Sequence, residues 1–375
     1  MKENSSKPSP IVVGLALFCM FFGSGNLIFP LFLGQVAQDN WLIALFGFMI
    51  TAVCLPLLGI IAMVMFEGHS KKFFDLLGRP WGFLLTLVLL LVWIPFGSAP
   101  RCISLSFASL STYLPIGNAW TYGAIYSLIA AFIVVQGSRM LNILGAYLTP
   151  ILLICLAAIF FGGLTSMPTT SSSLDTANLV FQSLKEGYNT MDLIASFFFS
   201  ASVIALLQKQ GGSLSSNLKL TFKAGFVAAI TLAVVYSALL YTAATHSADL
   251  VNVNKEQMLA HLAMVTLGTH LGGIAAAAIF LACITTSVAL VSVFTDFLTN
   301  SVFRNKSMYM VSLVLTSLVS YFMSITGLEG ITAVTSPALQ VCYPLLLVII
   351  IWGVVKRSME LTSQKKQLKE QEELS

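Results

Sequence analysis

An apolar stretch near the N-terminus, Ile11 to Gly34, limits what this chain can fold into. It runs for about 24 residues without a charged side chain, long enough to cross a bilayer's hydrocarbon core as one helix. Its middle, however, contains Gly23-Ser24-Gly25-Asn26, and Pro30 follows. Relative to alanine, glycine disfavours a helix interior by about 1 kcal/mol and proline by about 3 kcal/mol. The stretch therefore predicts two half-helices that meet near the middle of a membrane.

A broken helix in lipid frees backbone amides and carbonyls that no water can reach. Such a break is tolerated only where it is buried in protein or lines a wet cavity. Secondary transporters hold their substrate and coupling ion at breaks of this kind. We therefore expect a binding site at this break.

The composition places the whole chain in a membrane. Hydrophobic residues make up 57% of it and charged residues 9%, against about 25% charged in a soluble domain. Hydropathy predicts an all-α polytopic membrane protein with about ten transmembrane helices. The polar start, Met1 to Pro10, is too short for a signal peptide, so we expect the first span to stay in the mature protein.

Charge predicts the orientation. With a cytoplasmic N-terminus, sixteen of the nineteen lysines and arginines lie inside, Lys185 and Lys255 lie outside, and Arg101 lies within a span. This asymmetry satisfies the positive-inside rule and predicts that both termini are cytoplasmic.

The spans are expected to form two sets of five, the second inverted relative to the first, with discontinuous helices 1 and 6. Span six carries Ser196, Ser200 and Ser202, which could bind freed backbone groups, but no glycine or proline. The loops near 165–187 and 246–270 are read either as short helices over the outer face or as solvated connections. The expected segments are a cytoplasmic N-terminus (1–10), a first repeat (11–163), an outer loop (164–187), a second repeat (188–355) and a charged cytoplasmic tail (356–375).

The first break offers an anion site. The N–H groups of Gly23, Ser24 and Gly25 point out of a half-helix N-terminus, which carries about half a positive charge and suits a substrate carboxylate. Asn26 could add its side chain. The alternative is a kink that only brings two helices close together.

Span eight offers a cation site. Ala282 and Thr286 share a helix face, and Thr285 is adjacent. Their oxygens, with the carbonyls of Cys19 and Phe22 freed by the break, form a hard-oxygen cluster suited to Na⁺. Alternatively, the hydroxyls bond back to their own helix.

Two charges lie at membrane depth. Arg101 is expected to face the protein interior with a partner, and Asp192 is the first candidate; a functional role and structural pairing both remain open. Phe197, Phe198 and Phe199 could wall a pocket for an aliphatic side chain or pack elsewhere. The six cysteines are scattered singly, which predicts neither a disulfide framework nor a metal site.

Several motifs resemble the bacterial branched-chain amino acid carriers of the BrnQ type. They are Phe21-Phe22-Gly23-Ser24-Gly25-Asn26-Leu27-Ile28-Phe29-Pro30, Leu55-Pro56-Leu57-Leu58-Gly59, Pro100-Arg101, Gly187-Tyr188-Asn189-Thr190-Met191-Asp192 and Leu281-Ala282-Cys283-Ile284-Thr285-Thr286.

The resemblance implies a LeuT-like fold of the amino acid/polyamine/cation transporter superfamily and alternating access in a bacterial inner membrane. It implies symport of leucine, isoleucine and valine, usually with Na⁺ and without a further cofactor. It also implies Na⁺ binding at Cys19, Phe22, Ala282, Thr285 and Thr286, and carboxylate binding at Gly23, Ser24 and Gly25. Family members commonly have about twelve spans, and this chain has about ten.

Other functions remain as alternatives. A proton-coupled carrier of apolar amino acids such as methionine would use Asp192 or Asp296. An intramembrane hydrolase acting through Ser24 needs a base at membrane depth, and no predicted span contains a histidine. We therefore expect a transporter rather than an enzyme, with no nucleic-acid partner.

Overall fold

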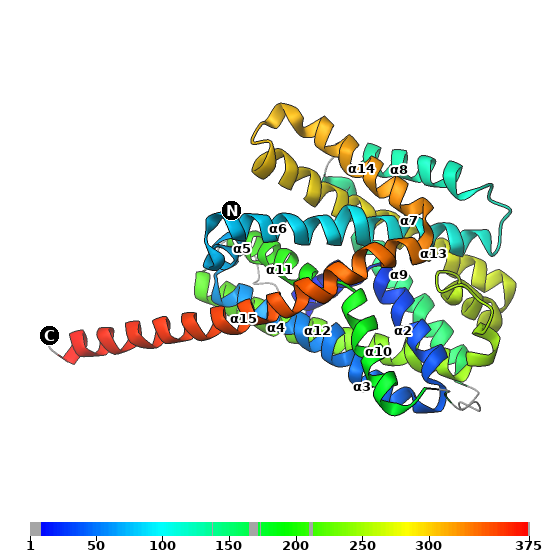
Figure 1. Ribbon diagram of the computed structural model, residues 1–375, viewed down its shortest axis with the longest axis horizontal. Coiled ribbons are helices and arrows are strands. Elements are labelled where there is room, and N and C mark those ends of the chain that lie inside the picture. Colours follow the sequence, from blue (N-terminus) through cyan, green and yellow to red (C-terminus); the bar gives the residue numbers. More distant parts are fainter. Residues whose placement is uncertain (1–8, 137, 165–171, 173, 210–212, 374–375) are drawn as a thin grey trace, which may run out of the picture.

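The computed structural model describes residues 9–136, 138–164, 172, 174–209 and 213–373 (Figure 1). Throughout these residues the regular structure is helical. Eight helical segments among them are long and apolar enough to cross a membrane, and Pro10–Phe21 and Pro150–Gly163 are shorter apolar helices. The chain is thus an all-helical, multi-pass membrane protein. Residues 1–8 of the expected N-terminal segment, and residues 165–171 and 173 of the expected outer loop, lie outside the described residues.

The α-helices have the following bounds: α1 Pro10–Phe21, α2 Ser24–Ala37, α3 Trp41–Met49, α4 Leu55–Met65, α5 Ser70–Phe74, α6 Arg79–Trp93, α7 Ala99–Ser111, α8 Ala119–Gln136, α9 Ser138–Gly163, α10 Thr176–Asn189, α11 Asp192–Lys209, α12 Leu214–Thr245, α13 Met258–Phe297, α14 Tyr309–Ile325 and α15 Gly327–Glu373. Three π-helical turns, η2 Ile50–Cys54, η4 Ile94–Ser98 and η6 Leu298–Val302, continue α3, α6 and α13.

Two long helices organise the packing. Helix α12 packs along α1 and α2, while α13 packs against α7 and α9. Helix α11 packs on α4, α10 packs on α3 and α2, and α15 crosses the bundle before its C-terminal part projects beyond it (Figure 1). Large apolar side chains such as Leu128, Phe132, Val348 and Ile351 remain exposed on the outside of the bundle. In a bilayer these side chains face lipid rather than water.

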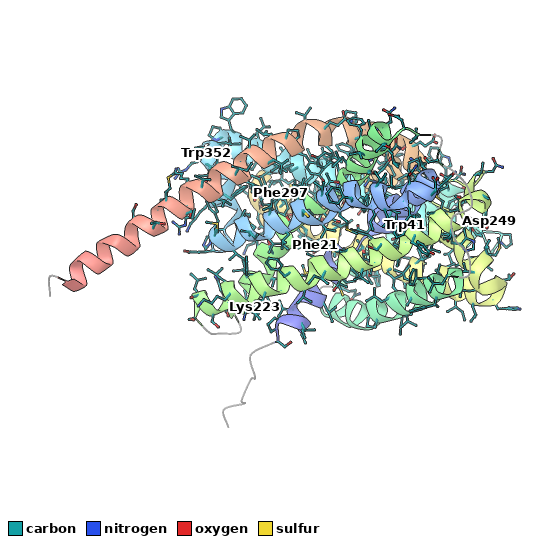
Figure 2. The ribbon with its side chains drawn as sticks, turned by 90° about the horizontal axis from the view of Figure 1, so that it is seen from below. Phe21, Trp41, Lys223, Asp249, Phe297 and Trp352 are labelled. Atoms are coloured by element: carbon teal, nitrogen blue, oxygen red, sulfur yellow. The ribbon has the colours of Figure 1, made fainter. Side chains whose placement is uncertain are left out.

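Charged residues mark both ends of the bundle. Figure 2 shows Lys223 and Asp249 toward opposite ends, with Phe21 between them. The end of the first half-helix, α1, therefore lies inside the bundle, away from both surfaces.

The chain is interrupted at two places inside the bundle. Between α1 and α2 it breaks at Phe22 and Gly23, and between α10 and α11 it breaks at Thr190 and Met191, where Met191 has a positive φ of 65°. The sequence predicts this second break in span six, where Ser196, Ser200 and Ser202 could bind the freed backbone groups. Instead, Ser196, Ser200 and Ser202 donate to carbonyls within a continuous α11, and the break precedes Asp192. Residues 176–187 form most of α10, the half-helix on the other side.

Small residues let α2 approach α12 closely. A Cβ added at Gly34 would overlap the carbonyl oxygen of Leu240 and crowd the methyl of Ala243. The backbones of α2 and α12 are therefore in direct contact, as is common between membrane helices.

Gly34→Ala should lower the stability of the protein. Forcing a methyl group into this contact displaces backbone, and overpacking of this kind costs about 1–3 kcal/mol. Gly273→Ala in α13 is the matched control, because its new Cβ would lie 3.8 Å from the nearest atom of Tyr113. Thermal melting of the detergent-solubilised protein measures the difference, and equal melting temperatures for the two variants would contradict the close α2–α12 contact.

Candidate binding site at two helix breaks

The first break turns the backbone out of the helix. Phe22 donates its N–H to the Phe18 carbonyl (2.8 Å) but has a non-helical ψ of 87°, so α1 ends there. The Gly23 N–H donates to Asn26 Oδ1 (3.4 Å), and α2 begins at Ser24. The first amides of α2 therefore have no partner within their own helix.

The two breaks touch each other. A Cβ added at Gly25 would lie 3.3 Å from both the Cα and the carbonyl oxygen of Thr190. Glycine lets the N-terminus of α2 approach the chain between α10 and α11 this closely, since a Cβ there would require its neighbours to shift by a few tenths of an ångström. Next to this contact, Asn26 Nδ2 donates to both carboxylate oxygens of Asp192, at 3.0 and 2.9 Å.

Asp192 is held by neutral donors. Besides Asn26, the hydroxyl of Tyr236 on α12 donates to Asp192 Oδ2 (2.6 Å) and also contacts Asn26 Nδ2. All three side chains are buried. Within the described part of the chain, no lysine or arginine forms an ion pair with this carboxylate. Because Asp192 lies in the first turn of α11, the positive end of that helix offsets part of its charge.

Arg101 reaches the opposite side of the second break. Its Nη1 donates to the Asn189 carbonyl at the end of α10 (2.6 Å), and its Nη2 donates to Thr335 Oγ1 (3.0 Å). The guanidinium also lies over the ring of Phe29, 5.0 Å from the centroid. The predicted pairing of Arg101 with Asp192 is therefore wrong. The break gives each charge its own helix end, a negative C-terminus for Arg101 and a positive N-terminus for Asp192.

Helix α13 lies beside the first break. A Cβ at Gly23 would be 3.6 Å from Cγ2 of Thr286, so the eighth predicted span meets this glycine. Thr285 Oγ1 donates to the carbonyls of Leu281 (3.1 Å) and Ala282 (2.9 Å), as in the back-bonded alternative. Cys19 is half-buried in the last turn of α1, and Phe22 is buried against Phe18. On the same side, the Ser24 hydroxyl donates to the Ser98 carbonyl (3.5 Å).

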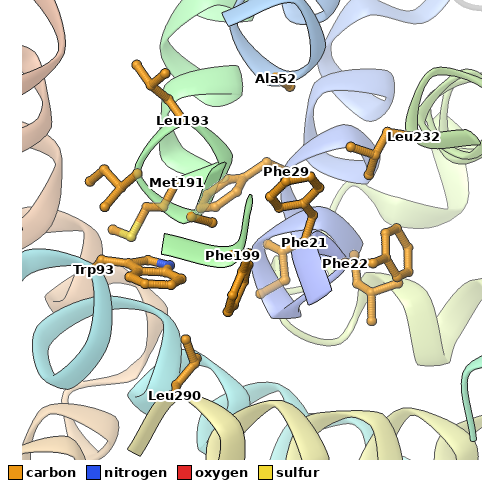
Figure 3. Close-up of a cluster of buried hydrophobic side chains, with 14 of the residues drawn as sticks. Phe21, Phe22, Phe29, Ala52, Trp93, Met191, Leu193, Phe199, Leu232 and Leu290 are labelled. Atoms are coloured by element: carbon orange, nitrogen blue, oxygen red, sulfur yellow. The ribbon is translucent and has the colours of Figure 1, made fainter. Parts of the chain in front are cut away.

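The three phenylalanines of α11 have different surroundings. Phe197 packs on Phe73 and Phe74, away from the breaks. Phe198 stacks on Trp93 with centroids 5.7 Å apart, and Phe199 contacts Trp93 (5.2 Å) and Phe21 (6.0 Å). Figure 3 shows Phe199 next to Phe21, with Trp93 on its other side. We define Trp93, Phe198 and Phe199 as an aromatic layer, which reaches the first break through the contact of Phe199 with Phe21.

A cavity of about 800 Å³ leads from one surface to this aromatic layer. Its deep end includes Leu90 and Phe198, and its mouth carries Lys71, Arg79 and Arg304. Phe198 lines the cavity, and Phe199 of the same layer contacts Phe21 at the end of α1. The cavity therefore opens at one end of the bundle and reaches the aromatic layer, which contacts the first break through Phe199.

Comparison with known proteins identifies the family. A model of the branched-chain amino acid transport protein family matches residues 6–369. The chain belongs to this family. It is 32% identical to the branched-chain amino acid permeases BrnQ and BraB of Bacillus subtilis (strain 168), over 360 and 371 residues. These matches cover 92% and 95% of this chain and 80% and 82% of the two permeases.

Solved structures show the fold of this branched-chain amino acid transport family member. The nucleobase-cation-symport-1 family transporter Mhp1, closed with bromovinylhydantoin bound, matches with a TM-score of 0.60 and 14% identity over 91% of this chain and 77% of its own. MhsT in complex with L-phenylalanine matches with a TM-score of 0.55 and 16% identity over 90% of this chain and 87% of its own. The fold is that of LeuT-type transporters, and the family is one of transporters, not enzymes.

Sequence reasoning missed two partners in this transporter's site. Tyr236 is one tyrosine in an apolar span, and nothing in the local sequence singles it out, although a buried tyrosine hydroxyl normally needs a hydrogen-bond partner. Glu186 was assigned to an outer loop, yet it is buried and accepts from Asn189 Nδ2 (3.0 Å) one turn before the break. The helical spacing of Glu186 and Asn189 was the available signal.

Tyr236→Phe should destabilise the protein more than Tyr126→Phe. The first change removes a donor from a buried carboxylate, which costs about 1–3 kcal/mol; the second removes a contact with the neutral Ser287 hydroxyl (3.1 Å) and costs about 1 kcal/mol. Thermal melting compares the two. In an Asp192→Asn background the Tyr236→Phe effect should shrink, because the two side chains share one interaction. Strictly additive effects would show that Tyr236 does not act through Asp192.

Proposed function

We propose that this transporter imports leucine, isoleucine and valine by symport with a cation, Na⁺, through alternating access. The observation that carries the proposal is the contact between the two breaks, where Gly25 meets the backbone of Thr190. The ends of two interrupted helices, with backbone groups outside the regular helical hydrogen-bond pattern, meet at one buried place, as a small zwitterionic substrate and its coupling ion require.

The substrate carboxylate is expected at the N-terminus of α2. The amides of Gly23, Ser24 and Gly25 lie at this positive helix end, and the absence of side chains on two of these residues leaves the backbone approachable. Asn26 then links the substrate's position to Asp192 through its amide group. The aliphatic side chain is expected near Phe199, which lies beside Phe21.

The coupling ion is expected between α1 and α13. Cys19 and Phe22 would supply carbonyl oxygens from the end of α1, Ala282 would supply a carbonyl from α13, and Thr285 and Thr286 would supply hydroxyls. Such an all-oxygen donor set suits a small hard cation. Its fit is supported by the approach of Thr286 to Gly23 and by the end of the α1 helix at Phe22. A threonine hydroxyl that donates back to its helix keeps lone pairs for a cation.

The orientation and the repeat belong to the same proposal. We expect residues 11–163 and 188–355 to form two inverted repeats in a bacterial inner membrane, with both termini cytoplasmic. Lys71, Arg79 and Arg304 at the mouth of the cavity support a cytoplasmic opening by the positive-inside rule. The structure then corresponds to an inward-facing state of the transport cycle.

A proton-coupled carrier of other apolar amino acids, such as methionine, is the second candidate. It is favoured by one observation: the buried carboxylate of Asp192 has only neutral hydrogen-bond donors among the described residues. A proton would remove the cost of keeping that charge away from water.

Leucine uptake into proteoliposomes, measured under a Na⁺ gradient alone and then under a pH gradient alone, decides between the two ions. Competition by unlabelled valine, isoleucine and methionine ranks the substrates.

Thr286→Val should raise the Na⁺ concentration that gives half-maximal leucine uptake by about tenfold. The change removes one proposed Na⁺ ligand without changing side-chain size, and a tenfold loss of affinity corresponds to about 1.4 kcal/mol. Thr266→Val is the control, because that hydroxyl, which precedes the non-helical Gly268 of α13, donates back to the Leu262 carbonyl (2.7 Å), outside the expected ion site. An unchanged Na⁺ dependence in Thr286→Val would remove this residue from the site.

A further inference from the structure

Lys255, in the connection between α12 and α13, contacts the two half-helices α2 and α10. It lies between Leu250 and Met258, in the segment that joins α12 to α13. Its ammonium is 3.3 Å from the centre of the Phe32 ring on α2 and 4.0 Å from Glu186 Oε1 on α10. The Lys255 side chain is 36% exposed and that of Glu186 only 5%. Burial lowers the pKa of the Lys255 ammonium, and nearby Glu186 raises it in part.

The contact continues inward to the second break. Glu186 Oε2 accepts from Asn189 Nδ2 (3.0 Å), and the Asn189 carbonyl accepts from Arg101 Nη1 (2.6 Å). Asn189 Oδ1 also accepts from Ser336 Oγ on α15 (2.7 Å). A chain of polar contacts therefore runs from Lys255 at the surface to the backbone at the end of α10.

A neighbouring contact joins the same connection to α15. Glu256 Oε1 accepts from the Leu328 N–H (2.5 Å) in the first turn of that helix. Burial raises the pKa of the Glu256 carboxyl, and the hydrogen bond to Leu328 lowers it in part. The surface connection thus holds α2, α10 and α15 together at one end of the bundle.

The other end of the bundle is open. The cavity with Lys71 and Arg304 at its mouth reaches Phe198. In Figure 1, α5, which carries Lys71, lies at the opposite end of the bundle from the connection between α12 and α13 that carries Lys255. A transporter that alternates access must separate one set of contacts while it forms the other. The contacts of Lys255 are therefore those that have to part when the path opens outward.

We propose that Lys255 and Glu186 form the outer closure of the transport path, and that Glu186 acts as a positioning residue by holding Asn189 and Arg101 at the second break. This inference rests on the proposed alternating access and orientation. Because Lys255 is partly exposed, its charge can be rehydrated when the pair separates, so the closure is reversible within each cycle. An aliphatic replacement of Lys255 should favour the outward-open state.

The test measures which side of the path is open. Thr86 lines the cavity and is half-buried. With the six native cysteines replaced, Thr86→Cys is labelled by a membrane-impermeant thiol reagent applied to the cytoplasmic face, in vesicles without Na⁺ or amino acid. Lys255→Met, which loses the ion pair and the cation–π contact, should slow this labelling about fivefold, and Glu186→Gln, which loses the ion pair alone, should slow it less. Lys255→Arg should restore the parental rate.

Lys185→Met is the matched control. Lys185 is an exposed lysine on α10 next to Glu186, and it repels Lys255, so its loss should not slow labelling. In correctly folded protein, parental labelling rates in both Lys255→Met and Glu186→Gln would overturn the proposal, and so would equal slowing in Lys185→Met. Because the assay needs neither ion nor substrate, a failure of Na⁺-driven leucine uptake would count against the proposed function and leave this result standing.

Discussion

When a helix is interrupted inside a membrane, its freed amides and carbonyls need new hydrogen-bonding or polar partners. In this protein two interrupted helices lie against each other, and the arrangement of the site depends on that contact. Gly25 allows the start of α2 to lie against the backbone of Thr190. Asn26 then bonds Asp192 just beyond the second break. Each break thus supplies polar surroundings for the other, while the long apolar helices α12 and α13 flank both.

The same interruption explains how two opposite charges can remain buried without pairing. Arg101 donates to the last carbonyl of α10, and Asp192 stands in the first turn of α11. A half-helix end is worth about 0.3–1 kcal/mol to a suitable charge, and up to about 2 kcal/mol when partly buried. These gains are small beside the cost of burying a charge, so the hydrogen bonds from Tyr236 and Asn26 to Asp192, and from Arg101 to Thr335, carry much of the remainder. Such a balance is sensitive to an ion or a zwitterion that arrives between the breaks.

Much of this could be predicted from the sequence, and what could not has a physical cause. The first break could be predicted because glycine and proline disfavour a helix locally. The membrane class could be predicted because composition is a property of the whole chain. No glycine or proline stands at the second break. Met191 has a positive φ there, a conformation that the sequence does not predict for a methionine. The pairing of Arg101 with Asp192 failed as a prediction because it considered side chains alone, whereas a backbone carbonyl was the better partner. Tyr236 belongs to the site through tertiary packing, which places α12 beside Asp192.

The two ends of the proposed path are closed by different chemistry, and this difference bears on how transport can be directed. On the side of the cavity, Trp93, Phe198 and Phe199 make ring contacts that carry no charge. On the other side, Lys255 and Glu186 close the path through partly hydrated charges. Aromatic contacts respond mainly to the shape of what lies against them, whereas the polar chain from Lys255 to Arg101 ends on the backbone of the second break. A substrate bound at the breaks would therefore act on the outer closure through hydrogen bonds and on the aromatic layer through packing, so that one ligand can influence both ends of the path.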